Sequence, residues 1–240
     1  MPRTGAVLLV ALATIAGAQG RAADPAGGLL LVANKGDQTL GIIDPVAGRQ
    51  VATVKQSGTT GHEVVASPDG RTAYVPIYGD AGVGRPGSDG RTMDVIDIAS
   101  RRRVATIDFG APERPHSAVF GPDGRLYVTA EGTNSIKVVD PRTNTVVDTL
   151  PTGQRESHML ALSSDGRTAY TSNLGSGTVS VVDVATKKVA AVVAVAARAQ
   201  RIALSTDGRL VFTADQDSPR LAIIDTKTNK LASGVALPGV

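Results

Sequence analysis

The sequence predicts an all-β fold, and three features support that class. Valine occurs 29 times among 240 residues, whereas Phe, Tyr and Trp together number seven, and β-branched side chains favour strands. Glycine and proline contribute 27 and 13 residues, which is typical of a chain with many turns. A four-residue turn also recurs at long intervals. These features predict many short strands joined by tight turns.

The composition excludes several kinds of chemistry and partner. The chain has no cysteine and no tryptophan, which excludes thiol nucleophiles, cysteine-ligated metals and the C-x-x-C-H attachment of haem c. Lys and Arg number 25 against 22 Asp and Glu, so the charge is nearly balanced. The longest basic run, residues 101–103, falls at an expected turn without aromatic neighbours. We therefore expect no specific nucleic-acid partner.

Residues 1–23 have the pattern of a secretory signal peptide. A positively charged start is followed by an apolar stretch from Gly5 to Ala18, which is shorter than the roughly 18 residues that a membrane span needs. Ala16-Gly17-Ala18 provides a cleavage site, with Ala18-Gln19-Gly20 as an alternative. The sequence thus predicts export to the periplasm or the medium, no membrane span, and a mature repeat domain over residues 24–240.

A repeated unit organises the rest of the chain. Four turns of the Ser-Pro-Asp-Gly type end in glycines that are 54, 42 and 42 residues apart, so the period is 42 with one insertion of about twelve residues. Each turn precedes a short β run such as Tyr127-Val128-Thr129. A second run ends in aspartate at a fixed phase, and two more runs complete each unit. The turn glycines are Gly70, Gly124, Gly166 and Gly208, and the strand-end aspartates are Asp44, Asp97, Asp140, Asp183 and Asp225.

Four short antiparallel strands in a period near 42 residues predict a β-propeller of four-stranded blades. Five blade units are present, and the first is incomplete because the chain opens at Leu29 with a second strand. An open ring would leave unpaired strand edges, which would favour self-association through that edge. We interpret the nine repeated aspartates as structural, because an Asp carboxylate accepts hydrogen bonds from its own turn.

The repeat resembles the YVTN-repeat β-propeller family, which includes YncE-like exported proteins. The resemblance rests on the Tyr-Val-Thr-like strands, the Val-Val-Asp and Ile-Ile-Asp strand ends, and the Thr-x-x-Val turns at 143–146 and 186–189, and it covers Leu29 to Val240. It implies a ring of seven blades and hence a chain truncated by about two blades. It implies no single function, because the family contains binders, parts of quinoprotein-like enzymes and relatives of lactonases.

The three histidines of the chain occupy one register of the repeat. His62, His116 and His158 each lie eight residues before the final glycine of a turn, and Gln200 takes this place in the next unit. The register begins the innermost strand, so its members should surround the mouth of the central channel. Imidazole binds Cu, Zn, Ni and Fe, and we predict a ligand site here with the three histidines as candidate metal ligands. Repetition of one ancestral unit would also place structural histidines in phase, and both interpretations stay open.

Further charged residues are expected near this mouth. Glu63, Glu113 and Glu156 are candidate ligands or hydrogen-bond acceptors for the imidazole rings. The insertion, Asp80 to Arg91, joins the second and third strands of its unit at the same end, where Arg85 and Asp89 are candidate ligand-facing charges. It contains Gly82-x-Gly84-x-x-Gly87, which we interpret as a chance match to the dinucleotide motif because it carries Pro86 and precedes a strand, not a helix.

Three functions are consistent with this sequence. The first is an exported binding protein that holds a small molecule, a metal or a partner protein at the channel mouth. The second is a metal- or cofactor-dependent oxidoreductase. The third is a lactonase-like hydrolase that uses channel-mouth side chains for acid–base chemistry. The sequence favours the first, which needs only the scaffold. A chain without Trp and Cys cannot carry the tryptophan docking motif and vicinal cysteines of quinone-cofactor dehydrogenases, and no recognisable nucleophile and base pair supports the hydrolase.

Overall fold

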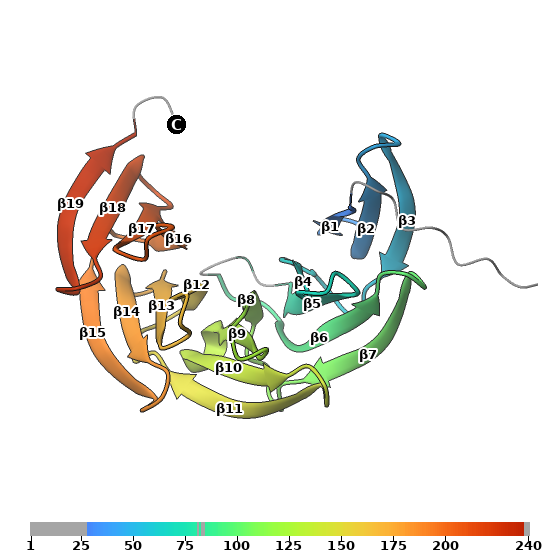
Figure 1. Cartoon of the computed structure of the whole chain (residues 1–240), viewed down its shortest axis with the longest axis horizontal. Helices are drawn as coiled ribbons and strands as arrows, with labels where there is room; N and C mark the ends of the chain where they lie inside the picture. The colour runs from blue at the N-terminus through green and yellow to red at the C-terminus, as the bar shows by residue number, and fades with distance from the viewer. Residues whose placement is uncertain (1–27, 81, 83–84, 238–240) are drawn as a thin grey trace, which may run out of the picture.

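The structure is a computed structural model that describes residues 28–80, 82 and 85–237. Its strands form five antiparallel sheets, which follow one another in chain order around an arc as the blades of a propeller (Figure 1). Blade 1 has three strands within the described residues, and blades 2 to 5 have four strands each. The predicted β-propeller of five blade units is therefore confirmed, and the incompleteness of the first unit stays a prediction. The predicted signal peptide, residues 1–23, lies outside the described residues.

The strands have the following bounds. Blade 1 contains β1 (Leu30–Asn34), β2 (Thr39–Asp44) and β3 (Arg49–Lys55). Blade 2 contains β4 (Val65–Ala66), β5 (Thr72–Gly79), β6 (Asp89–Asp97) and β7 (Arg102–Asp108). Blade 3 contains β8 (Pro115–Phe120), β9 (Leu126–Ala130), β10 (Ser135–Asp140) and β11 (Thr145–Pro151), with a short 3-10 helix η1 (Glu131–Thr133) between β9 and β10. Blade 4 contains β12 (Ser157–Leu162), β13 (Thr168–Asn173), β14 (Thr178–Asp183) and β15 (Lys188–Ala194). Blade 5 contains β16 (Ala199–Leu204), β17 (Leu210–Asp215), β18 (Arg220–Asp225) and β19 (Lys230–Ala236).

Apolar side chains fill the space between each pair of neighbouring blades. Ile136 and Leu150 of blade 3, for example, pack against Leu160 and Val182 of blade 4. Equivalent clusters lie between blades 1 and 2, 2 and 3, and 4 and 5. The middle strand β9 is therefore buried throughout, whereas the outer strand β11 is exposed or partly buried except at Leu150. This packing explains why β9 carries the consecutive apolar residues Leu126, Tyr127 and Val128, which face both neighbouring blades.

The recurring turns are held by their own side chains, as the sequence predicts. In the turn that ends at Gly166, Ser163 Oγ donates to Asp165 Oδ1 over 2.7 Å, and the same oxygen accepts the backbone N–H of Arg167. Gly166 has φ of +70°, a conformation that glycine adopts without steric cost. All nine repeated aspartates accept backbone N–H groups of their own turns, which confirms their structural role. Hydrogen bonding from Arg142 also lowers the pKa of Asp140 to about 2.

The insertion in blade 2 extends the hairpin that strands β5 and β6 form. Strand β5 continues to Gly79 and β6 begins at Asp89, with these two residues paired, so part of the expected loop is strand. A Cβ atom on Gly90 would lie 1.8 Å from the carbonyl oxygen of Ile77, so only glycine fits there. The Gly90 carbonyl accepts the N–H groups of Glu113 and Arg114, which docks the hairpin on the chain segment that enters blade 3.

Blades 1 and 5 lie at the two ends of the arc in Figure 1. Self-association through these ends stays a prediction. A search of the described residues finds no helix with the length and apolar character that a membrane crossing requires.

We expect the contact between blades to dominate stability. Ile136 has no exposed surface, and Ile136→Ala should reduce the free energy of unfolding by about 2–5 kcal/mol, because it leaves a cavity between blades 3 and 4. Val147 on the neighbouring strand β11 is 47% exposed, so Val147→Ala should change it by no more than about 0.5 kcal/mol. Urea unfolding followed by circular dichroism measures both, and equal losses would contradict the assignment of the core.

Candidate functional site

The histidine register lies at an irregularity that recurs at the start of each innermost strand. In blade 4 the pairing of β12 with β13 skips His158, because Ser157 and Met159 pair with the consecutive residues Asn173 and Ser172. Blade 3 skips His116 and Ser117 in the same way, and blade 5 skips Gln200. In blade 2, His62 follows an isolated bridge at Gly61. Such bulges turn a side chain out of the sheet plane, so the register faces its neighbours around the centre.

The chain enters each of these strands through a strained residue. Thr60, Arg114 and Glu156, two positions before the histidines, have φ of 58°, 52° and 54°. Their carbonyl groups accept backbone N–H groups from residues at the end of the second strand of the same blade or directly after it, which include Tyr78 in β5 and Glu131 after β9. The backbone therefore places Tyr78 and Glu131 beside the histidine register, although they lie 15 or 16 residues further along the chain.

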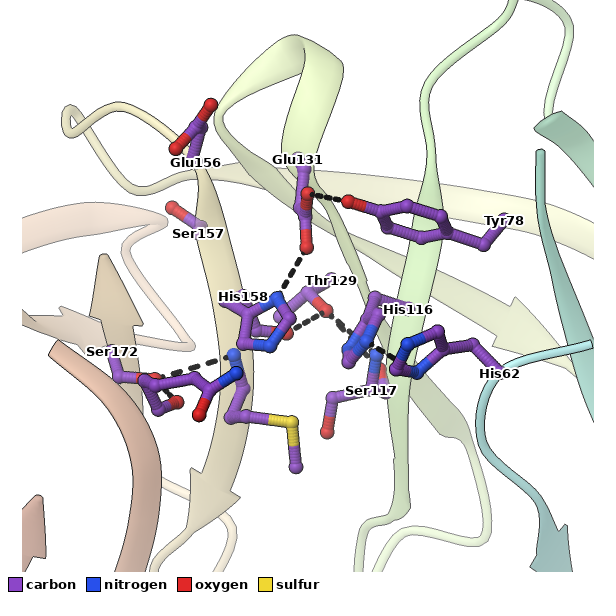
Figure 2. Close-up of polar contacts among 12 residues, drawn as sticks. His62, Tyr78, His116, Ser117, Thr129, Glu131, Glu156, Ser157, His158 and Ser172 are labelled. Carbon is purple, nitrogen blue, oxygen red and sulfur yellow. Dashed lines mark hydrogen bonds and ion pairs between the residues drawn. The ribbon is translucent and has the colours of Figure 1, made fainter. Parts of the chain in front are cut away.

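The three histidines, which come from three successive blades, form one continuous row (Figure 2). The Nε2 atom of His116 lies 2.9 Å from the Nδ1 atom of His62, and these nitrogens share one hydrogen bond. The rings of His116 and His158 pack with centroids 4.0 Å apart, and those of His62 and His116 lie 4.5 Å apart. The predicted convergence of the histidines is therefore present in the structure, while their role as ligands stays a prediction.

A buried carboxylate and a buried phenol complete the row. Figure 2 shows Glu131 between His158 and Tyr78. One oxygen of Glu131 lies 2.5 Å from Nδ1 of His158, and the other accepts the hydroxyl of Tyr78 over 2.7 Å. The side chains of His158 and Glu131 are each only 1% exposed. Burial of the hydroxyl, followed by the negative charge of Glu131, raises the pKa of Tyr78 above its ordinary value, so Tyr78 remains a donor.

His116 is the most enclosed member of the row. It has no exposed surface, and burial, together with the neighbouring His158 and His62, holds its pKa well below the ordinary value. Its Nδ1 atom is buried and makes no hydrogen bond of good geometry. The nearby carbonyl group of His158 already accepts the hydroxyl of Thr129 over 2.7 Å. At neutral pH His116 is therefore an uncharged imidazole with one ring nitrogen that has no hydrogen-bond partner.

The solvent side of the row carries an ion pair. Glu63 lies 3.7 Å from Nδ1 of His62 and 3.4 Å from a guanidinium nitrogen of Arg201, which comes from blade 5. Contact with His62 lowers the pKa of Glu63, and Arg201 lowers it further, although partial burial opposes the shift. Arg201 is 57% exposed, so this end of the row is open to solvent.

The potential metal-binding side chains fall into two sets. Within the described residues, the ligand atoms of His116, Glu131 and His158 all lie within 4.8 Å of one another, and so do those of His62, Glu63 and His116. The first set is buried and the second is partly exposed apart from His116. Each set thus contains two histidines and one carboxylate, whereas the sequence suggests a single set of three histidines.

The remaining residues of the predicted site have other partners or are exposed. Asp89 forms an ion pair with Arg114, and Arg85 is exposed on the hairpin. Glu113 pairs with Lys137 over 3.0 Å, and Figure 2 shows Glu156 away from the imidazoles. Gln200 is half-buried, and its carbonyl accepts the Ser172 hydroxyl. Ligand binding by Arg85, Asp89 and Gln200 stays a prediction.

Sequence reasoning missed Tyr78 and Glu131. Both stand at one position of the repeat, four residues after the aromatic residue of the Tyr-Val-Thr-like strand, and Leu174 and Gln216 take this position in blades 4 and 5. The available signal in the sequence was that this position varies from unit to unit and carries a tyrosine in one unit and a glutamate in another. Only the bulges and the crossover bonds show that this register faces the histidines.

Comparisons with known proteins agree on the class of fold. The sequence model of the family described as "Cytochrome D1 heme domain" matches residues 120–238, just under half of the chain. The matched segment includes Glu131 and His158 and excludes His62 and His116. A solved structure of Kuenenia stuttgartiensis hydrazine synthase superposes with a TM-score of 0.73 at 19% identity, covering 94% of this chain and 70% of that one. The chain is thus a β-propeller of the same general kind as these proteins.

A curated sequence also matches a short segment. The PE-PGRS family protein PE_PGRS18 of Mycobacterium tuberculosis (strain ATCC 25618 / H37Rv) is 38% identical over 52 residues. These residues make up 22% of this chain and 11% of that protein, so the chain spans only about a tenth of its length.

Removal of the Tyr78 hydroxyl should destabilise the protein. Tyr78→Phe leaves one oxygen of the buried Glu131 without its donor, and we expect a loss of about 1–3 kcal/mol in the free energy of unfolding. The matched control is Tyr127→Phe, which removes a 3.0 Å bond to the exposed Asp123, where water can replace it, and should cost less than about 1 kcal/mol. Urea unfolding measures the loss in the free energy of unfolding for both variants. A smaller loss for Tyr78→Phe than for Tyr127→Phe would contradict the hydrogen-bonded role of Glu131.

Proposed function

We propose that this chain is an exported β-propeller binding protein that holds a transition-metal ion in its histidine row. The observation that carries the proposal is the buried set of His116, Glu131 and His158, whose ligand atoms lie within 4.8 Å of one another. Two imidazoles and a carboxylate are a donor set suited to Zn, Fe, Ni or Cu ions. A buried carboxylate and two buried imidazoles are costly to enclose, and a bound cation would compensate that cost.

The surroundings of the set support a preformed site. One oxygen of Glu131 lies 2.5 Å from Nδ1 of His158, so these two atoms already face each other, and an ion bound by both would replace the proton that they share. Tyr78 fixes the second oxygen of Glu131. The pKa of His116 is lowered by burial first, so His116 does not need to lose a charge before it binds a cation.

The family described as a haem domain raises the question of whether haem fits this row. The rings of His116 and His158 pack against each other at 4.0 Å, which leaves no space between them for a macrocycle. Both side chains are buried, and the matched segment excludes His116 and His62. The residues present therefore do not fit a haem at the buried pair, and a single ion fits them better.

A metal-dependent oxidoreductase is the second candidate. Two histidines and one carboxylate with open coordination positions are the donor set of non-haem iron enzymes, and the buried Tyr78 lies beside it. The lactonase-like hydrolase stays a prediction from the sequence.

The metal site is tested on protein freed of metal with a chelator. Equilibrium dialysis against Zn(II), Cu(II), Ni(II) or Fe(II), followed by mass spectrometry of the metal, should give a stoichiometric ion for the folded protein. At a free concentration of 100 times Kd, the ion should add about 2.7 kcal/mol to the free energy of unfolding. His158→Asn and Glu131→Gln should weaken binding strongly.

The control is Asp148→Asn, which removes an outer-strand carboxylate that pairs with Lys187 over 2.7 Å. It should bind the ion as the unaltered protein does. Absence of any bound ion in folded protein, or equal binding by the unaltered protein and His158→Asn, would contradict the proposal.

Export is tested separately. The cleavage pattern predicts that the protein recovered from the periplasm or the medium begins at Gln19, and the mass of the intact protein and its N-terminal sequence measure this. Full-length protein retained in the cytoplasm would contradict export and would leave the metal site unaffected.

A further inference from the structure

We infer that His116 bridges two metal ions, one in each of the two ligand sets that share it. This inference rests on the proposed function, because the inner ion is the one proposed above. It adds a second, outer ion, bound by His62, Glu63 and His116. The result is a dinuclear centre with an imidazolate bridge.

The two ligand sets have matching compositions. The inner set contributes Glu131 and His158, the outer set contributes Glu63 and His62, and His116 belongs to both. Each ion would therefore have two imidazoles and one carboxylate, with positions left for water or an external ligand. One histidine between two equivalent donor sets is the arrangement that a bridged pair of ions requires.

The two ring nitrogens of His116 have different surroundings. The Nε2 atom lies 2.9 Å from Nδ1 of His62, so it faces the outer set. The Nδ1 atom is buried and without a hydrogen bond, so it is the nitrogen available to the inner set. On binding both ions, the neutral imidazole of His116 releases its one N–H proton to solvent, and each nitrogen then donates a lone pair to one ion.

A proton now occupies the position of the outer ion. The hydrogen bond between His116 and His62 holds two nitrogens that would ligate the same ion. Metal–nitrogen bonds of about 2.0–2.1 Å at tetrahedral angles need nitrogens about 3.3 Å apart, so the rings must separate by only a few tenths of an ångström. His62 is 19% exposed and starts the innermost strand at an isolated bridge, where such a movement meets little resistance.

The two ions should differ in exchange. The inner set is buried, whereas Glu63 is 32% exposed and pairs with Arg201. Arg201 competes with the outer ion for this carboxylate, and its exposed side chain can move away when the ion binds. We therefore expect a tight inner ion and a weaker, exchangeable outer ion.

The experiment measures stoichiometry and coupling. The folded protein should bind two equivalents of Zn(II) by dialysis and mass spectrometry, His62→Gln and Glu63→Gln should bind one, and His158→Asn should lose the tight equivalent. Loaded with Cu(II), the protein should give an electron paramagnetic resonance spectrum of two coupled ions, which His62→Gln converts into that of one isolated ion. Arg201→Ala should bind the outer ion about two- to fivefold more tightly, since it removes an exposed ion pair.

The outcomes separate the inference from the proposed function. No bound ion would overturn both. One equivalent in the unaltered protein, unaffected by His62→Gln, would leave the proposed function intact and overturn the second ion. Two equivalents with uncoupled Cu(II) spectra would overturn the bridge through His116. The outer-set variants change partly exposed side chains, so they test the inference without altering the buried set.

Discussion

The packing of each sheet against its neighbours is the constraint on which the rest of the structure depends. A blade of four short strands has two apolar faces and is stable only when both are covered, and the buried clusters between successive blades cover them. The same stacking brings the innermost strands of three blades together at one end. His62, His116 and His158 lie close because their blades must stack, and no local sequence contact joins them.

Electrostatics explains why the row has the members it has. A carboxylate as enclosed as Glu131 is costly without hydrogen-bond donors, and Tyr78 and His158 supply one for each of its oxygens from the two neighbouring blades. A second charged group of blade 3, Glu113, is neutralised by Lys137 within the same blade and takes no part in the row. The partner of each buried carboxylate therefore decides whether it joins the row: Glu131 is bound by residues of other blades, and Glu113 by a residue of its own blade. The Nδ1 atom of His116 has no hydrogen-bond partner.

The sequence predicted the parts of this structure that repeat. The 42-residue period, the aspartate turns and the shared phase of the histidines each occur several times, so coincidence could be rejected from spacing alone. Tyr78 and Glu131 occur once each, at a position where blades 4 and 5 carry Leu174 and Gln216. Their contacts depend on the bulges at the innermost strands and on a backbone bond between chain segments about 17 residues apart, which no pattern of residue types reveals. The sequence likewise could not reveal that Asp89 pairs with Arg114, because these residues lie in different blades.

The change from one set of three histidines to two sets of mixed ligands follows from the propeller geometry. Successive blades are rotated about the central axis, so three copies of one register form a row, and the first and last copies contact the middle one without sharing a common point (Figure 2). A row of three imidazoles therefore defines two binding positions with the central ring common to both. Carboxylates complete these positions from different sources. Glu131 comes from the register after the second strand, and Glu63 follows His62 directly. Repetition thus fixes the row, and the departures from repetition decide which ligands each position receives.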